Sequence, residues 1–154
     1  MLYIGVDLGT SAVKLLLMDE KGEIKKNTSR EYGLEFPHPG WSQQNPCDWF
    51  TQSMDGLKEL LADCDKSQVA GISFGGQMHG LVVLDEKDQV IRPAILWNDG
   101  RTVKQTDYLN NVIGKDKLSE YTANIAFAGF TAPKILWMKE EEPENFAKIK
   151  KIML

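Results

Sequence analysis

The sequence has 154 residues, of which 42% are hydrophobic and 26% charged, and its formal net charge is −4. This length fits one domain with a real core, and the mixed charges include no long basic run of the kind that binds nucleic acid or a membrane surface. No apolar run is long enough to span a bilayer, and the apolar start lacks the basic leader of a signal peptide. Cys47 and Cys64 show no metal-ligand spacing and are interpreted as reduced thiols, so we expect a cytoplasmic protein without nucleic-acid or membrane partners.

Three antiparallel strands are predicted to open the chain. Apolar residues alternate over 2–6 and lead to Asp7, and after a short turn a second apolar run occupies 13–18. A hairpin turn at 19–22 then leads to a third, more polar strand over 23–32. Strands joined by such short turns pair antiparallel.

A helix is predicted over residues 46–62. Asn45 caps its start, and Pro46 takes the first helical position, where the N–H that proline lacks has no partner within the helix. Apolar side chains at helical spacing predict a buried stripe made of Phe50, Met54, Leu57 and Leu61.

The strand predicted next, over 68–74, is apolar enough to be buried on both faces. The later predicted elements are a hairpin at 81–91, a strand at 94–97, helices at 102–112, 115–122, 131–140 and 143–148, and the beginning of a strand at 149–154. This order indicates an α/β fold of the ribonuclease-H-like kind, with a mixed five-stranded sheet, helices and an inserted hairpin.

The turn after the first strand has the residues of a phosphate site. Gly9 allows a turn conformation that a Cβ would penalise, while the amides of Gly9, Thr10 and Ser11 and two hydroxyls could cradle phosphate oxygens. Asp7 could hold Mg²⁺, which prefers one or two carboxylates together with substrate phosphates. A polar hairpin turn with a surface aspartate is the alternative interpretation.

Residues 75–80 follow the end of a predicted buried strand, where open α/β sheets bind ligands. Gln77 and His79 offer hydrogen bonds suited to hydroxyl groups, and Met78 offers an adaptable apolar surface. This mixture suits a sugar. A glycine loop with a surface histidine is the alternative.

A second polar group follows the strand at 94–97. Trp97, Asn98, Asp99 and Arg101 lie on one turn, which is typical of a binding site beside an aromatic ring. The alternatives are that Trp97 belongs to the core and that Arg101 pairs structurally with an acidic neighbour such as Asp99.

Four runs of sequence resemble the amino-terminal part of the xylulokinases, members of the FGGY carbohydrate kinase family. They are IGVDLGTSAVK at 4–14, GGQMHG at 75–80, AILWNDGRT at 94–102 and FTAPKILW at 130–137. The resemblance implies an actin- and hexokinase-type ATPase fold and the phosphorylation of D-xylulose at its 5-hydroxyl, with ATP and Mg²⁺.

The same resemblance implies residue roles. Asp7 is expected to be the Mg²⁺-linked carboxylate, and the remaining expected roles are phosphate binding by Gly9, Thr10 and Ser11 and sugar binding by Gln77, Met78, His79, Trp97 and Asp99. The aspartate that acts as general base and the second, ATP-binding lobe are expected beyond Leu154. Residues 1–154 are therefore expected to be a truncated amino-terminal, sugar-binding domain that does not turn over alone.

Two alternatives stay open from the sequence. The substrate could be a related sugar such as ribulose or gluconate, or the chain could be a non-catalytic sugar- or nucleotide-sensing domain. A reading frame that continues into a second lobe would exclude the sensing domain. The sequence leaves the oligomeric state undetermined, with a homodimer of the full-length protein as one arrangement.

Overall fold

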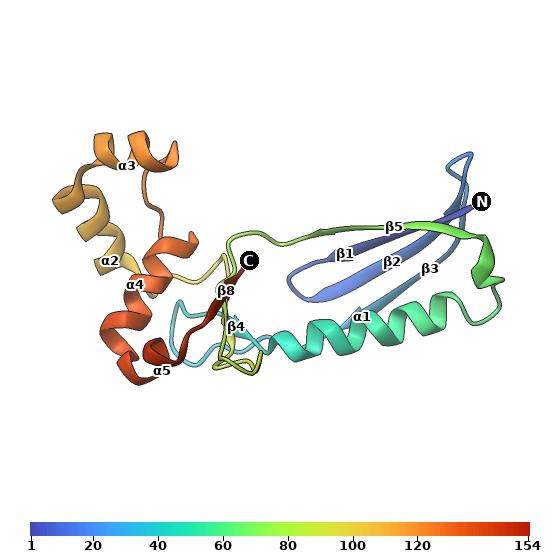
Figure 1. Ribbon diagram of the computed structural model, residues 1–154, viewed down its shortest axis with the longest axis horizontal. Coiled ribbons are helices and arrows are strands. Elements are labelled where there is room, and N and C mark those ends of the chain that lie inside the picture. Colours follow the sequence, from blue (N-terminus) through green and yellow to red (C-terminus); the bar gives the residue numbers. More distant parts are fainter. The chain divides into compact units, whose positions relative to one another are not determined.

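The chain is divided into two units in a computed structural model that describes all residues from 1 to 154 (Figure 1). Unit 1 consists of residues 1–33 and 46–77, and unit 2 consists of residues 34–45 and 78–154. The chain therefore passes between the units three times, and the last passage falls inside the motif at 75–80.

Unit 1 contains a four-stranded sheet with the order β3-β2-β1-β5. Its strands are β1 (Leu2–Leu8), β2 (Ala12–Asp19), β3 (Ile24–Glu31) and β5 (Val69–Gly76). The three opening strands are antiparallel, as predicted, and β5 pairs parallel with β1. The alternation of buried and exposed residues along β2 follows from the period of two in an extended chain.

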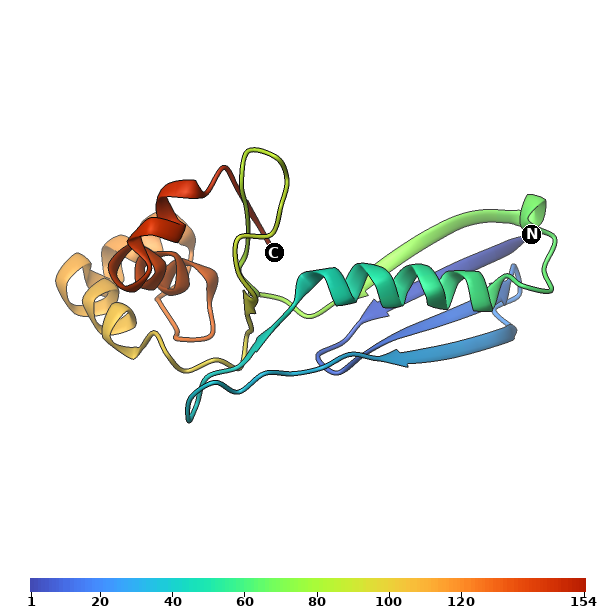
Figure 2. The same ribbon diagram turned by 90° about the horizontal axis from the view of Figure 1, so that it is seen from below.

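Helix α1 (Pro46–Leu60) lies along one face of this sheet and packs on β2 and β3 (Figure 2). It begins at the predicted proline and ends two residues before the predicted end. The predicted buried stripe is only half right. Leu57 and Leu61 pack against the core, but Phe50 is 70% exposed and Met54 is 40% exposed, because the helix turns its glycine side toward the sheet.

The glycine that allows this approach is Gly56, which is buried in the middle of α1. A Cβ at this position would lie 2.5 Å from Leu15 Cδ1, and Leu15 itself is 1% exposed in the core. The helix and β2 therefore meet at a point where no side chain fits, and this contact sets which face of α1 is buried.

The prediction that residues 68–74 are buried on both faces is wrong for this chain. Strand β5 is an edge strand, with Ile72 45% exposed and Phe74 63% exposed. The short 3₁₀ helix η1 (Lys66–Gln68) leads into β5. Helix α1 packs mainly on β2 and β3, which β1 separates from β5 in the sheet. Apolar side chains identify a strand, but only the neighbouring elements decide how far it is covered.

Unit 2 has two small antiparallel sheets instead of the predicted fifth strand of the main sheet. They are formed by β4 (Gln43–Gln44) with β7 (Ala94–Ile95), and by β6 (Val82–Leu84) with β8 (Lys151–Met153). The final strand predicted at 149–154 is therefore present, but it pairs with the inserted hairpin. Strand β4 lies between the third predicted strand and the predicted helix at 46–62, where no strand was predicted.

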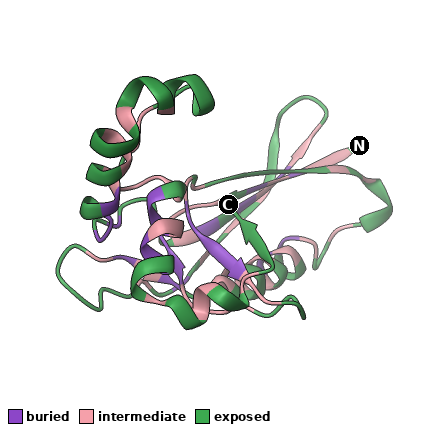
Figure 3. Cartoon of the chain, turned by 60° about the vertical axis from the view of Figure 1, so that its left-hand side comes forward, coloured by how far each residue is buried: buried purple, intermediate pink, exposed green.

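The helices of unit 2 follow the predicted order. They are α2 (Val103–Tyr108), the π-helix η2 (Leu109–Gly114), α3 (Lys115–Thr122), α4 (Thr131–Glu141) and α5 (Pro143–Lys148). The core of the unit consists of Leu81, Val83, Ile95, Trp137 and Met138, whereas α3 is almost entirely exposed (Figure 3). No helix combines the length and the apolar composition that crossing a membrane requires.

The close contact at Gly56 leads to a first prediction. Replacing an exposed helical glycine by alanine usually stabilises a helix by roughly 1 kcal/mol. Gly56→Ala is expected to destabilise unit 1 by about 1–3 kcal/mol instead, because the new methyl group overlaps Leu15. Urea unfolding followed by circular dichroism measures the effect.

A compensating change tests the cause. Leu15→Val in the Gly56→Ala background removes the overlapping methyl group, and it should recover part of the lost free energy of unfolding. Lys58→Ala, on the exposed side of the same helix, is the control. A Gly56→Ala variant as stable as the parent would contradict the packing argument.

Candidate functional site

Asp7 lies at the end of β1, and its side chain is exposed. The following turn is closed by a hydrogen bond from the amide of Gly9 to the carbonyl oxygen of Ala12, at 3.0 Å. In this conformation the amide donates within the turn, and phosphate binding by Gly9 stays a prediction. The φ of Gly9 does not lie in the left-handed region, and glycine is favoured here because a Cβ would lie 3.0 Å from Ala12 O.

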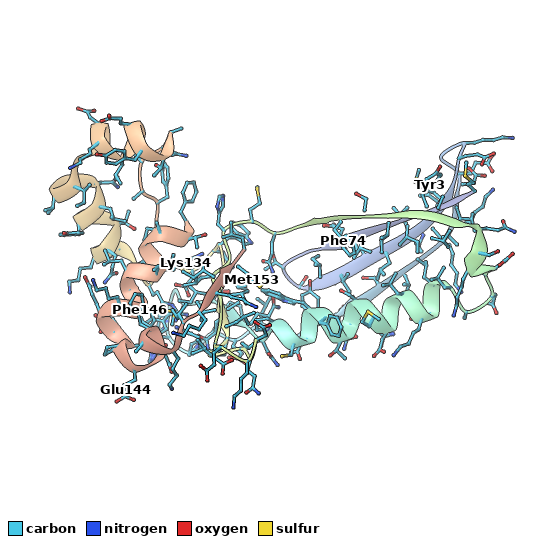
Figure 4. All side chains as sticks on the ribbon, in the orientation of Figure 1. Tyr3, Phe74, Lys134, Glu144, Phe146 and Met153 are labelled. Atoms are coloured by element: carbon cyan, nitrogen blue, oxygen red, sulfur yellow. The ribbon has the colours of Figure 1, made fainter.

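Lys14 is the residue directly opposite Asp7 in the β1–β2 register. Cross-strand partners project on the same face of a sheet, so a cation and a carboxylate lie side by side there. Both line an open hollow of about 520 Å³ that also includes Ser73 and Phe74, the latter labelled in Figure 4. Lys14 was assigned no role from the sequence, although the predicted pairing of the first two strands already placed this residue near Asp7.

Tyr32 supports the turn from the end of β3. Its hydroxyl donates a hydrogen bond to Gly9 O, and its amide donates to Ser11 O at 3.1 Å. The side chain is 8% exposed, and burial, together with the negative charge of Asp7, raises the pKa of the phenol to about 12. One tyrosine thus holds both ends of the predicted phosphate-binding segment.

The glycine motif begins beside the same turn. Gly75 and Gly76 complete β5, and the amide of Gln77 donates to Leu8 O at 2.9 Å. A Cβ at Gly76 would lie 3.2 Å from Leu8 O, so the close pairing of the two strand ends requires glycine. The side-chain oxygen Oε1 of Gln77 is buried and has no hydrogen-bond partner.

His79 is the residue of the motif with an unusual backbone. Its φ is 62°, in the left-handed region that residues other than glycine rarely adopt. Its ring stacks on Phe130 with centroids 4.3 Å apart and planes inclined by 18°. Both residues line a hollow of about 310 Å³ in unit 2, and the preceding Met78 is 69% exposed.

Trp97 follows β7, and its side chain is 49% exposed, so it does not belong to the core. Asp99, in contrast, is buried, and both of its carboxylate oxygens accept hydrogen bonds within the protein. Arg101 Nε donates to Oδ1 at 2.9 Å, Arg101 Nη2 donates to Oδ2 at 2.8 Å, and the Ser42 amide donates to Oδ2 at 2.6 Å. The structural pairing of Arg101 with Asp99 is therefore observed, and a contact of Asp99 with a sugar stays a prediction.

The predicted site residues thus form two groups. The first group belongs to unit 1 and consists of Asp7, the turn at 9–11 and Gln77. Because β1 and β5 run parallel, these residues lie at the same end of the sheet. Met78, His79, Trp97 and Asp99 belong to unit 2. That both groups serve one kinase site stays a prediction.

The burial of Tyr32 predicts how stability depends on pH. The phenol has a pKa near 10 in the unfolded chain and about 12 in the folded one, so its contribution is complete below pH 10 and is lost as the pH rises toward 12. Between pH 8 and 11 the parent chain should lose about 1 kcal/mol more free energy of unfolding than Tyr32→Phe. Tyr121→Phe, at a tyrosine that is 70% exposed, is the matched control. Equal pH dependence of the parent and Tyr32→Phe in urea unfolding would contradict this.

The pair of Asp99 and Arg101 predicts a large effect of removing one partner. Both side chains are 0% exposed, so Arg101→Met leaves a buried carboxylate without its counter-ion and is expected to cost about 3–5 kcal/mol of stability. Asp99→Asn added to this variant should recover part of the loss. Lys58→Met, which breaks an exposed pair with Asp55, should change stability by less than about 1 kcal/mol in the same urea titration. A small effect of Arg101→Met would show that the pair is not buried.

The chain is similar to known proteins over nearly its whole length. The chain is 48% identical over 154 residues to a xylulose kinase of Lactococcus lactis subsp. lactis, covering 98% of this chain and 30% of that protein. It is also 48% identical over 147 residues to a xylulose kinase of Bacillus subtilis, covering 94% of this chain and 29% of that protein. The chain therefore spans about 30% of the length of these relatives.

Solved structures show the same fold. A xylulose kinase from Rhodospirillum rubrum matches with a TM-score of 0.93 and 27% identity, over 99% of this chain and 32% of that one. A gluconate kinase from Lactobacillus acidophilus matches with a TM-score of 0.92 and 26% identity, over 99% and 31%. Residues 2–154 match the N-terminal domain of the FGGY family of carbohydrate kinases, and the chain belongs to this family.

Proposed function

We propose that the protein containing this chain phosphorylates D-xylulose at its 5-hydroxyl with ATP, in the cytoplasm, and that residues 1–154 form its sugar-binding domain. The observation that carries this proposal is the 48% identity, over nearly the whole chain, to xylulose kinases of two bacteria. The polar motif at 75–80 supports it, because it supplies neutral hydrogen-bonding groups rather than the cations that an acidic substrate would need.

In this proposal, the turn after β1 receives the phosphates of the nucleotide. Ser11 is exposed at the turn, and Lys14 and Asp7 are neighbours on one face of the sheet. No group of three or more His, Cys, Asp or Glu side chains could hold a metal ion by itself. A single exposed carboxylate fits Mg²⁺ that arrives with phosphates, and Asp7 would hold it. The ion would neutralise charge on the phosphoryl group during transfer.

The sugar would contact residues of the second group, together with Gln77 from the first. His79 and Gln77 would bind its hydroxyls, Met78 would supply an apolar contact, and Trp97 offers an exposed ring face. Phosphoryl transfer depends mainly on positioning and charge neutralisation, so few residues are enough. The resemblance places the general base beyond Leu154, and we assign this role to no residue of the present chain.

The similarity to a gluconate kinase favours one further candidate, a kinase of a related sugar. Gluconate carries a carboxylate, which a cation would have to bind. The two relatives described above, each 48% identical to this chain, are xylulose kinases, and we therefore place xylulose first.

The experiment is a steady-state assay on the protein encoded by the complete reading frame. ATP turnover is measured with xylulose, ribulose and gluconate, and kcat/KM is expected to be highest for xylulose. Asp7→Asn should lower kcat by about 100-fold or more, because it removes the carboxylate that would hold Mg²⁺ against the transferring phosphoryl group. Asp63→Asn, at a carboxylate whose side chain is 93% exposed, is the control.

Other results would change the conclusion. A higher kcat/KM for gluconate or ribulose would favour the related-sugar kinase. Sugar binding in a calorimetric titration without any phosphorylation would favour a sensing domain. The 154-residue chain alone is expected to bind sugar weakly and to show no turnover.

A further inference from the structure

The backbone of His79 adopts an unfavourable conformation that contacts with other residues must stabilise. A non-glycine residue in the left-handed region clashes with its own backbone and is found mainly where surrounding groups hold it. The next residues enter a regular pairing, since the Leu81 amide donates to Ile95 O at 2.9 Å. This pairing fixes the chain after His79 but leaves open what holds the carbonyl group of His79 itself.

Lys134, in the first turn of α4, makes that contact. Its Nζ donates hydrogen bonds to His79 O at 2.6 Å and to Gly129 O at 2.8 Å, and the hydroxyl of Thr131 lies 3.4 Å from the same His79 oxygen. The side chain of Lys134 is completely buried, and Figure 4 shows it at the start of α4. Hydrogen bonds from a cation are shorter and stronger than those between neutral groups.

The second carbonyl links Lys134 to the other predicted sugar-binding loop. A Cβ at Gly129 would lie 2.3 Å from the carbonyl oxygen of Trp97, so these two backbones touch. Phe130, which follows, stacks on the ring of His79. Lys134 therefore lies where the backbones that carry His79 and Trp97 converge.

A buried ammonium is a poor choice if stability were its only purpose. Burial lowers the pKa of Lys134 to about 8, against the opposing effect of Asp99, and the charge of Arg101 lowers it further. Its hydrogen-bond partners are carbonyl oxygens and include no carboxylate. An apolar side chain of similar length would avoid this desolvation cost. The contact with His79 gives a reason for the lysine that packing does not.

We propose that Lys134 is a positioning residue for sugar binding, which fixes the main chain of His79 so that the imidazole lies against Phe130 and presents its nitrogen atoms to the sugar hydroxyls. This inference rests on the proposed function of the motif at 75–80. Lys134 itself does not touch the sugar. Without it, the left-handed backbone of His79 relaxes and the imidazole leaves its position.

The test is a double-mutant cycle in the protein encoded by the complete reading frame. Lys134→Met keeps the length and apolar stem of the side chain but removes its hydrogen-bond donors. It is expected to raise the KM and the calorimetric Kd for xylulose roughly ten- to hundred-fold, with the KM for ATP unchanged. In the His79→Ala background the same substitution should have little further effect, because the group that it positions is absent.

Lys139→Met is the matched control, since it removes an exposed lysine from the same helix. A purely structural role would lower the amount of active enzyme and leave both KM values unchanged, and this result would overturn the proposal. Additive effects of Lys134→Met and His79→Ala on the sugar Kd would overturn it as well. Parent protein that neither binds nor phosphorylates any of the sugars would instead contradict the proposed function.

A second variant covers the case in which Lys134→Met does not fold, as judged by circular dichroism. Thr131→Val keeps the volume of the side chain and removes only the longer hydrogen bond to His79 O. It should raise the sugar Kd in the same direction by roughly two- to five-fold. An unchanged Kd in Thr131→Val, together with a misfolded Lys134→Met, would assign Lys134 to the core alone and would reject the proposal.

Discussion

The parallel pairing of β1 with β5 is the constraint on which the arrangement of unit 1 depends. In the parallel register Asp7 lies opposite Gly75 and Leu8 lies opposite Gly76. The carboxyl ends of the two strands therefore lie at the same end of the sheet. The hydrogen bond from the Gln77 amide to Leu8 O continues this pairing beyond the sheet. Asp7 and the motif at 75–80, which we propose to bind metal and sugar, are far apart in the sequence and are thus connected by backbone hydrogen bonds, which depend little on side-chain identity.

In unit 2, buried cationic side chains connect segments that lie far apart in the sequence. Gln43 Oε1 accepts hydrogen bonds from Arg92 at 2.9 Å and from Arg101 at 3.2 Å, and the Arg101 guanidinium lies 4.0 Å from the ring centroid of Trp41. Lys134 joins His79 to Gly129 in the same way. Buried charges add little net stability, because desolvation offsets their attraction. Here these cations connect groups that lie far apart in the sequence, as Lys134 connects His79 and Gly129.

The residues of the candidate site that were proposed from the sequence are those whose chemical type suggests a function. Residues whose part depends on tertiary contacts were not found in this way. Asp7 and the motif at 75–80 stand out because a carboxylate and a glycine cluster with polar side chains lie at the ends of predicted strands, where open α/β sheets bind ligands. The partnership of Asp99 with Arg101 was one of two open alternatives, since a short polar turn can face a ligand or fold onto itself. Lys134 lies within the run FTAPKILW but was assigned no role from the sequence, because a lysine within a helical pattern is normally exposed.

By itself the sequence determined the α/β class, the order of the elements and the family, because periodicity, turn residues and extended motifs are local properties of the chain. Tertiary structure decided the rest. The contact of Gly56 with Leu15 set the buried face of α1, and the pairing of β8 with β6 took the final strand out of the main sheet. These outcomes depend on which surfaces meet, and that is a free-energy difference between whole arrangements that no short stretch of residues encodes.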